Sequence, residues 1–251
     1  MKLEINLPTH LNEIPLKRYQ EFLQVQENSN DEEFIAQKMI EIFCGIDLKD
    51  IAKIKLVELN ALIEHFSKLF NTKHPLQHTF KIDKYEFGFI TELEEITFGE
   101  YVDIENYLVG WENMHKAMAV LYRPIVKKHG QTYEIAPYEP NKDFQELMKF
   151  APLGVALSAR VFFYNLEKEL LMATLHYLEN LMRKQQKNIP ITANEVNLIN
   201  NGGGIQAYMD SLKETSQSLM RLQDIDLLNV LPISLTKNKK TKSKQTNLIN
   251  S

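Results

Sequence analysis

The chain has 251 residues, of which 44% are hydrophobic and 25% are charged, with 29 basic and 33 acidic side chains. A chain of this length can bury about 70% of its surface on folding, which suffices for one large domain or two small ones. The single cysteine, the nine glycines and the hydrophobic fraction exclude disulfide scaffolds, collagen-like chains and wholly disordered chains.

The N-terminus and the apolar stretches indicate where the protein resides. The first eight residues are too polar for the apolar core of a signal peptide. No stretch is long and apolar enough to cross a bilayer, since even residues 151–181 carry five charged side chains. We therefore expect a soluble protein without membrane contact, inside a cell or in a particle.

Charge is unevenly distributed along the chain. Five lysines lie within Lys237–Lys244, and no acidic residue follows Asp226. Without these five charges the net charge changes from −4 to −9, so the remainder is acidic and suits protein partners with basic surfaces. The lysines predict weak, salt-sensitive contact with DNA or with a partner. They are Lys237, Lys239, Lys240, Lys242 and Lys244.

Two segments alternate apolar and polar residues with the period of a β-strand. The first is Lys2–Leu7, which Pro8 ends. The second is Thr79–Ile90, where Asp83 and Lys84 interrupt the alternation and predict a hairpin turn. We expect the N-terminal strand to pair with this hairpin in a small antiparallel sheet of about three strands. Residues 133–138 form a further short strand or an extended arm.

Apolar residues at helical spacing predict most of the remaining elements. Asp31 is a suitable N-cap for a helix over Glu32–Cys44, and Gly45 is a suitable left-handed stop. The other predicted helices are Pro15–Val25, Lys55–Phe70, Phe98–Leu108, Trp111–Tyr122 (closed by Pro124), Leu153–Lys184 and Ile205–Leu222.

Two helix starts carry the residues of a capping box. Thr97 can accept a hydrogen bond from the backbone of Glu100, whose side chain can return one to Thr97. The same spacing recurs at Thr192 and Glu195. Both are structural signals.

The predicted fold class is mainly α with a small antiparallel β-sheet (α+β). We expect a helical body over residues 1–190 and a C-terminal helical segment over 191–233 with a glycine hinge at 202–204. Residues 234–251 are expected to form a disordered basic tail, because their Lys, Asn, Thr and Ser residues cannot form a core.

Residue patterns that carry chemistry are weak in this chain. His74 and His78 lie four apart, but Pro75 between them disfavours a helix that would present both to a metal. Cys44 at a helix C-terminus is expected to be a buried thiol, because the helix dipole there disfavours a thiolate. Gly202–Gly204 is not followed by the Lys-Ser/Thr pair of a phosphate loop. We expect no catalytic residue, metal or cofactor.

The aromatic and methionine-rich middle of the chain has two interpretations. Such residues most often form a core, but Trp, Tyr, Met and Arg are also enriched at protein interfaces. The candidate interface residues are Tyr101, Trp111, Met118, Tyr122 and Arg123.

The runs Ile96–Glu105 and Met118–Ile125 resemble a class of tailed-bacteriophage proteins found among the structural and assembly genes of crAss-like phages. The resemblance covers about Tyr85–Tyr138. It implies a non-enzymatic virion protein, made in the host cytoplasm, which binds at the portal vertex or neck and stabilises the head–tail connection. The implied partners are the portal protein, the major capsid protein, other neck proteins and further copies of this chain.

Two other functions remain open. The first is an assembly chaperone that binds a tail or capsid protein and is absent from the finished particle. The second is a small hydrolase or nucleotide-binding enzyme, which the residue patterns favour least.

Overall fold

The computed structural model describes residues 5–72, 74–130, 132–187, 190, 192 and 209–215. These residues form a mainly helical body with one four-stranded antiparallel sheet, which confirms the α+β fold class. The second capping box, the glycine hinge and the basic tail lie outside the described residues, except for the isolated Thr192. The predicted domain boundaries therefore stay predictions.

The N-terminal part is a group of helices whose ends follow local capping chemistry. Asp31 Oδ1 accepts the N–H groups of Glu33 and Phe34 at 3.0 and 3.2 Å, as its N-cap prediction requires. Gly45 ends that helix with a φ of 69°, as predicted. The helices are α1 (Leu16–Asn28), α2 (Glu32–Cys44), α3 (Leu48–Ile51) and α4 (Leu56–Phe70), preceded by the short 3-10 helix η1 (Leu11–Glu13).

The sheet has the order β1-β2-β3-β4, with every neighbouring pair antiparallel. The predicted hairpin is confirmed, with Ile82 paired to Tyr85 across the turn. The strands are β1 (Thr79–Ile82), β2 (Tyr85–Phe89), β3 (Tyr122–His129) and β4 (Thr132–Ile135).

The predicted N-terminal strand is wrong for the described residues 5–7, which belong to no strand. Ile5 and Leu7 instead pack against the core from an irregular segment. His65 Nε2 on α4 lies 2.7 Å from the carbonyl oxygen of Pro8, which holds this segment beside the helix. Alternation over six residues describes any extended segment with one buried side, so it did not identify a sheet partner.

The partner of the hairpin is β3, in a region where the sequence predicted the end of a helix. The predicted helix Trp111–Tyr122 is instead the 3-10 helix η3 (Trp111–Asn113) followed by α6 (Met114–Leu121). Pro124 does not merely close the helix but lies within β3, where pairing with β2 ends and pairing with β4 begins. The carbonyl of Pro124 still accepts the N–H of Ala136 at 2.9 Å. The missing N–H of Pro124 therefore weakens the hydrogen bonding of the sheet only slightly.

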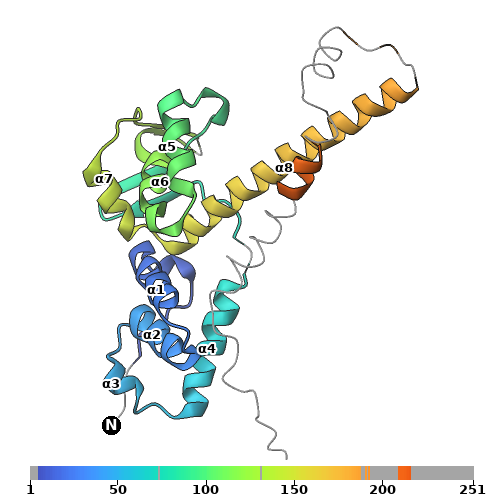
Figure 1. Ribbon diagram of the computed structural model, residues 1–251. Coiled ribbons are helices and arrows are strands. Elements are labelled where there is room, and N and C mark those ends of the chain that lie inside the picture. The colour runs from blue at the N-terminus through green and yellow to red at the C-terminus, as the bar shows by residue number, and fades with distance from the viewer. Residues whose placement is uncertain are drawn as a thin grey trace, which may run out of the picture.

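The remaining helices are α5 (Phe98–Leu108), α7 (Lys142–Leu147) and α8 (Leu153–Gln186), with the 3-10 helices η2 (Leu93–Glu95) and η4 (Met148–Phe150). α8 has 34 residues, a length of about 51 Å, and agrees with its prediction to within two residues. It starts where the N-terminal helices meet the part built from the sheet and α5–α7, and it extends away from both (Figure 1).

The first two turns of α8, Leu153–Ala159, are buried and bonded to both parts. On one side, Leu16 N–H donates to Ala151 O at 2.9 Å, just before α8 begins, and Leu153 N–H donates to Ile14 O at 2.8 Å. On the other, Gln77 N–H donates to the buried Ser158 Oγ at 3.2 Å, and the buried Tyr122 hydroxyl donates to Gln77 O at 2.7 Å. These buried turns therefore join the two parts of the body.

A close approach of β4 to β2 occurs at Gly88. A Cβ atom placed on Gly88 would lie 2.3 Å from Cε2 of the Tyr133 ring. The Tyr133 hydroxyl donates to Phe89 O at 3.0 Å and to His78 O at 3.2 Å. The ring can therefore lie across β2 only where β2 has no side chain.

We predict that Gly88→Ala lowers the free energy of unfolding by about 1–3 kcal/mol, because the Tyr133 ring must move and its hydrogen bonds break. The backbone at Gly88 is not left-handed, so alanine itself adds no strain. When Tyr133 is already replaced by alanine, Gly88→Ala is expected to change the free energy of unfolding only slightly. Urea unfolding of the wild type, the two single variants and the double variant measures these free energies. If the losses of the single variants add up in the double variant, the contact between Gly88 and the Tyr133 ring is contradicted.

Candidate interaction surface

Beyond its buried turns, α8 presents a row of apolar residues to solvent. Leu166, Leu170 and Tyr177 are 41, 69 and 51% exposed. With the exposed Ala173 they follow the spacing i, i+4, i+7 and i+11, which places them on one face of a helix. We call these four residues the α8 stripe. Apolar residues at this spacing on an exposed helix indicate contact with another surface.

A second apolar face of α8 is covered within the chain. Leu175, Leu178 and Leu181 are buried against Met209, which belongs to the helical segment 209–215. On this face of α8, apolar residues are thus buried by a second helical segment of the chain. The α8 stripe, about a third of a turn away, has no such segment against it among the described residues.

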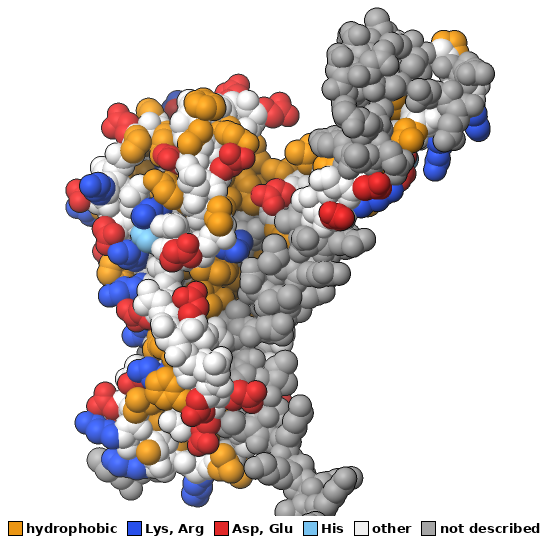
Figure 2. Space-filling view, viewed as in Figure 1, with side chains coloured by type: hydrophobic (Ala, Val, Ile, Leu, Met, Phe, Trp, Pro, Cys, Tyr) orange, Lys and Arg blue, Asp and Glu red, His pale blue; other side chains and the backbone are white. Residues whose placement is uncertain are grey.

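α5 carries another exposed apolar area. Phe98 and Val109, at its two ends, are each 81% exposed, and Tyr101 between them is 46% exposed. The Tyr101 hydroxyl donates to a carboxylate oxygen of Glu105. In the space-filling view, hydrophobic side chains gather on the part of the body around α5 and on α8 where it leaves the body (Figure 2).

The five predicted interface residues fall into different environments. Tyr101 is at the surface, as an interface residue requires. Met118 and Tyr122 are 0 and 1% exposed, so their prediction as interface residues is wrong and they belong to the core. Trp111 is also buried, with its ring 4.8 Å from that of Tyr19 and with Arg160 at 4.7 Å over its face. Composition could not separate these roles, because the same residue types serve cores and interfaces.

Arg123, the fifth candidate, forms a buried ion pair instead of an open contact. Its guanidinium lies 3.0 Å from Oε1 of Glu100, and the two side chains are 14 and 4% exposed. The other carboxylate oxygen of Glu100 accepts the N–H of Thr97 at 2.7 Å, which completes the predicted capping box. Burial lowers the pKa of Arg123, while the Glu100 carboxylate and Tyr138 act to raise it. Glu100 thus joins the start of α5 to β3.

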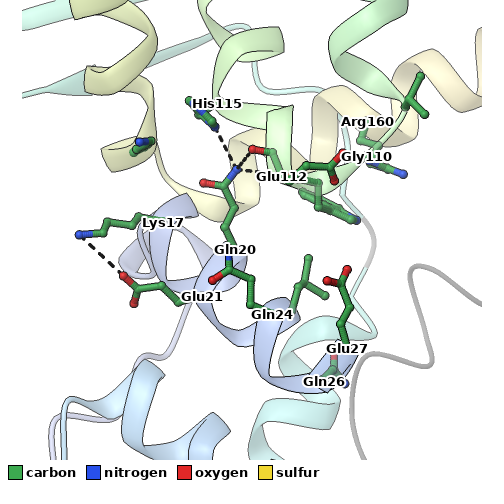
Figure 3. Close-up of a pocket in the computed structure, with 14 residues that line it drawn as sticks. Lys17, Gln20, Glu21, Gln24, Gln26, Glu27, Gly110, Glu112, His115 and Arg160 are labelled. Carbon is green, nitrogen blue, oxygen red and sulfur yellow. Dashed lines mark hydrogen bonds and ion pairs between the residues drawn. The ribbon is translucent and has the colours of Figure 1, made fainter. Parts of the chain in front are cut away.

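A pocket of about 940 Å³ lies between α1 and the segment around η3 (Figure 3). Its best-connected group is Gln20, whose Nε2 donates to Trp111 O at 2.7 Å and lies 3.1 Å from Nδ1 of His115. The amide nitrogen is also 3.2 Å from Glu112 O. The two protons of this amide group are thus shared among the Trp111 carbonyl, the Glu112 carbonyl and the His115 ring. These groups are already used to hold α1 against η3.

His115 is 7% exposed and its pKa is lowered. Burial is the main cause, Lys149 and Lys116 lower it further, and Glu146 and the backbone of Glu112 oppose the shift. The pocket therefore holds a histidine that becomes charged at a lower pH than an ordinary histidine does.

A groove of about 920 Å³ lies where α8 leaves the sheet. Its apolar lining includes Leu76, Leu93 and Phe162, and its rim carries the exposed carboxylates of Glu92, Glu94 and Glu95. Phe162 precedes Leu166 by four residues, so the α8 stripe begins at this groove. We call it the α8 groove. Nothing in the local sequence indicates that α8 would lie beside these acidic residues.

The remaining sequence candidates do not form a site. Cys44 is buried, and burial raises the pKa of its thiol to about 11. His74 Nε2 lies 3.2 Å from Phe70 O, at the end of α4. The five predicted contact lysines, from Lys237 to Lys244, lie outside the described residues. Within the described part of the chain, no helix combines the length and apolarity that a membrane span needs.

We predict that Glu100→Ala lowers the free energy of unfolding by about 3 kcal/mol, because it leaves the buried Arg123 charge unpaired and removes half of the capping box. Glu94→Ala, which changes an exposed carboxylate just before the same helix, is the control and is expected to change stability by less than about 0.5 kcal/mol. Urea unfolding compares them, and equal effects would show that the ion pair is dispensable.

We predict that His115 makes the protein less stable in mild acid. Its folded pKa lies below its ordinary value of 6.5, so as the pH falls through 6.5 the unfolded chain binds more protons than the folded chain does. The free energy of unfolding then falls as the pH drops from 7 to 5.5. His115→Gln should reduce this slope, because it removes the titrating ring. Unfolding titrations at several pH values measure the slopes, and an unchanged slope in His115→Gln would refute the assignment.

Comparison with known proteins gives this chain no relative. No protein-family model, curated protein or solved structure matches it. The features that bear on function are therefore the exposed apolar faces of α5 and α8, the acidic groove between α8 and the sheet, and the resemblance of the runs Ile96–Glu105 and Met118–Ile125 to phage proteins.

Proposed function

We propose that this chain is a non-enzymatic structural protein that binds other proteins through α8, and that it acts at the portal vertex or neck of a tailed-phage particle. The observation that carries the binding role is the α8 stripe. Its residues project beyond the body on a helix whose first turns are buried, so the stripe is presented on a firmly held support.

The phage location is supported by the resemblance of the two sequence runs around α5 and β3. Those runs include Thr97 and Glu100 of the capping box and Arg123, which the structure joins in one ion-paired junction. The resemblance thus covers residues that shape the body next to α8. The proposed partners are the portal protein, the major capsid protein, other neck proteins and further copies of this chain.

The exposed area on α5 gives the proposed protein a second contact surface. Phe98 and Val109 are more exposed than Leu166, Leu170 and Tyr177 of the α8 stripe. A structural protein placed between neighbours in a particle needs more than one such surface, because each copy must contact at least two others. An assembly chaperone, the alternative function, needs only one and leaves with its client.

The test is quantitative peptide mass spectrometry of gradient-purified particles from the phage that carries the gene. A structural role predicts a fixed ratio of this chain to the portal protein. The double variant Leu170→Glu/Tyr177→Glu is expected to lower that ratio at least tenfold, because it places two charges in the stripe. Leu56→Glu/Val57→Glu, at two exposed apolar positions on α4, should keep the wild-type ratio.

Two outcomes would contradict the proposal. Absence of the wild-type chain from particles, together with abundance in infected cells, would support the chaperone. A wild-type ratio for the double variant would show that α8 is not the contact surface. Thermal unfolding of each variant, expected to match that of the wild type, separates lost binding from lost folding.

A further inference from the structure

The α8 groove combines an apolar lining with unneutralised negative charge. Glu92, Glu94 and Glu95 lie within four residues at its rim and are all exposed. Among the described residues, no lysine or arginine forms an ion pair with any of the three. A segment that fits the groove must therefore bring apolar side chains for its lining and positive charge for its rim.

This chain contains one segment of that chemistry, and it lies outside the described residues. Residues 227–235 are mostly apolar, and Lys237–Lys244 follows with five lysines and no acidic residue. The apolar part is Leu227, Leu228, Val230, Leu231, Ile233 and Leu235. The order of the two parts, apolar first and basic second, allows one continuous segment to contact both the lining and the rim.

The length of chain between the described helix and this segment is sufficient. Segment 209–215 packs against α8 at Leu175–Leu181, and the groove is reached at Phe162. The separation along α8 is 13 to 19 residues, or about 20–29 Å. Residues 216–226 can span up to about 36 Å when extended. A tether this short gives an effective concentration in the millimolar range, which favours the same chain over a second copy.

We propose that residues 227–244 of the same chain dock in the α8 groove, with their apolar side chains on Leu76, Leu93 and Phe162 and their lysines on Glu92, Glu94 and Glu95. The docked segment lies next to Leu166, the first residue of the α8 stripe. A protein that binds the stripe therefore competes with it. The proposal concerns the chain alone and is independent of the phage assignment.

The first test is carbodiimide cross-linking of the full chain, which joins a lysine amine directly to a carboxylate in contact with it. Mixing ¹⁵N-labelled and unlabelled protein separates links within a chain from links between chains. The proposal predicts links within a chain from Lys237–Lys244 to the rim glutamates. Links that join the tail to other carboxylates just as often, links only between chains, or no links from the tail would overturn it.

The second test is the rate at which trypsin cleaves at the tail lysines. The variant Glu92→Lys/Glu94→Lys/Glu95→Lys is expected to raise this rate about tenfold, because it removes three exposed ion pairs that hold the segment. Glu27→Lys/Glu58→Lys/Glu139→Lys, which makes the same change in net charge at exposed positions elsewhere, should keep the wild-type rate. Equal rates in both variants would overturn the proposal. Since all six positions are exposed, both variants should fold.

Discussion

The buried first two turns of α8 are the constraint on which the rest of the structure depends. Their backbone bonds to the N-terminal helices through Ile14, and Ser158 bonds to the segment that leads into the sheet. The residues of the first set are buried, so breaking its bonds would leave polar backbone groups unpaired at a cost of about 1–3 kcal/mol each. The bond between Gln77 and Ser158 is partly buried. The turns therefore hold the two parts of the body together and fix the direction in which the exposed length of α8 projects.

A second junction holds α5 against the sheet and uses one carboxylate for two tasks. Glu100 caps its own helix through Thr97 and neutralises Arg123 at the start of β3. Beside it, the Tyr138 hydroxyl donates to Asp103 of α5. The polar residues of this region thus stabilise the packing of α5 against the sheet, while Phe98 and Tyr101 remain exposed at the surface. That division is expected of a protein whose function is contact, since the contact surface must be held in place by groups that do not take part in it.

The two faces of α8 explain how one helix can serve both folding and binding. One face is covered by segment 209–215, and the other begins at an acidic groove and continues as exposed apolar residues. If the basic end of the chain occupies the groove, the negative charge of the body and the positive charge of the tail neutralise each other locally. A protein that binds the stripe would then have to displace the tail to reach the base of the stripe.

The sequence by itself determined what depends on neighbouring residues: the capped helix over Glu32–Cys44, the capping box at Thr97, the hairpin and the length of α8. Caps, turns and helical periodicity involve residues a few positions apart, so their physics is local. Only the tertiary structure decided that β3, and not the described N-terminal residues 5–7, pairs with the hairpin, and that Met118 and Tyr122 are core residues. It also decided that α8 leaves an exposed stripe beside acidic residues about 70 to 85 positions earlier in the chain. Those outcomes depend on which surfaces meet across the chain, and residue type alone does not specify that.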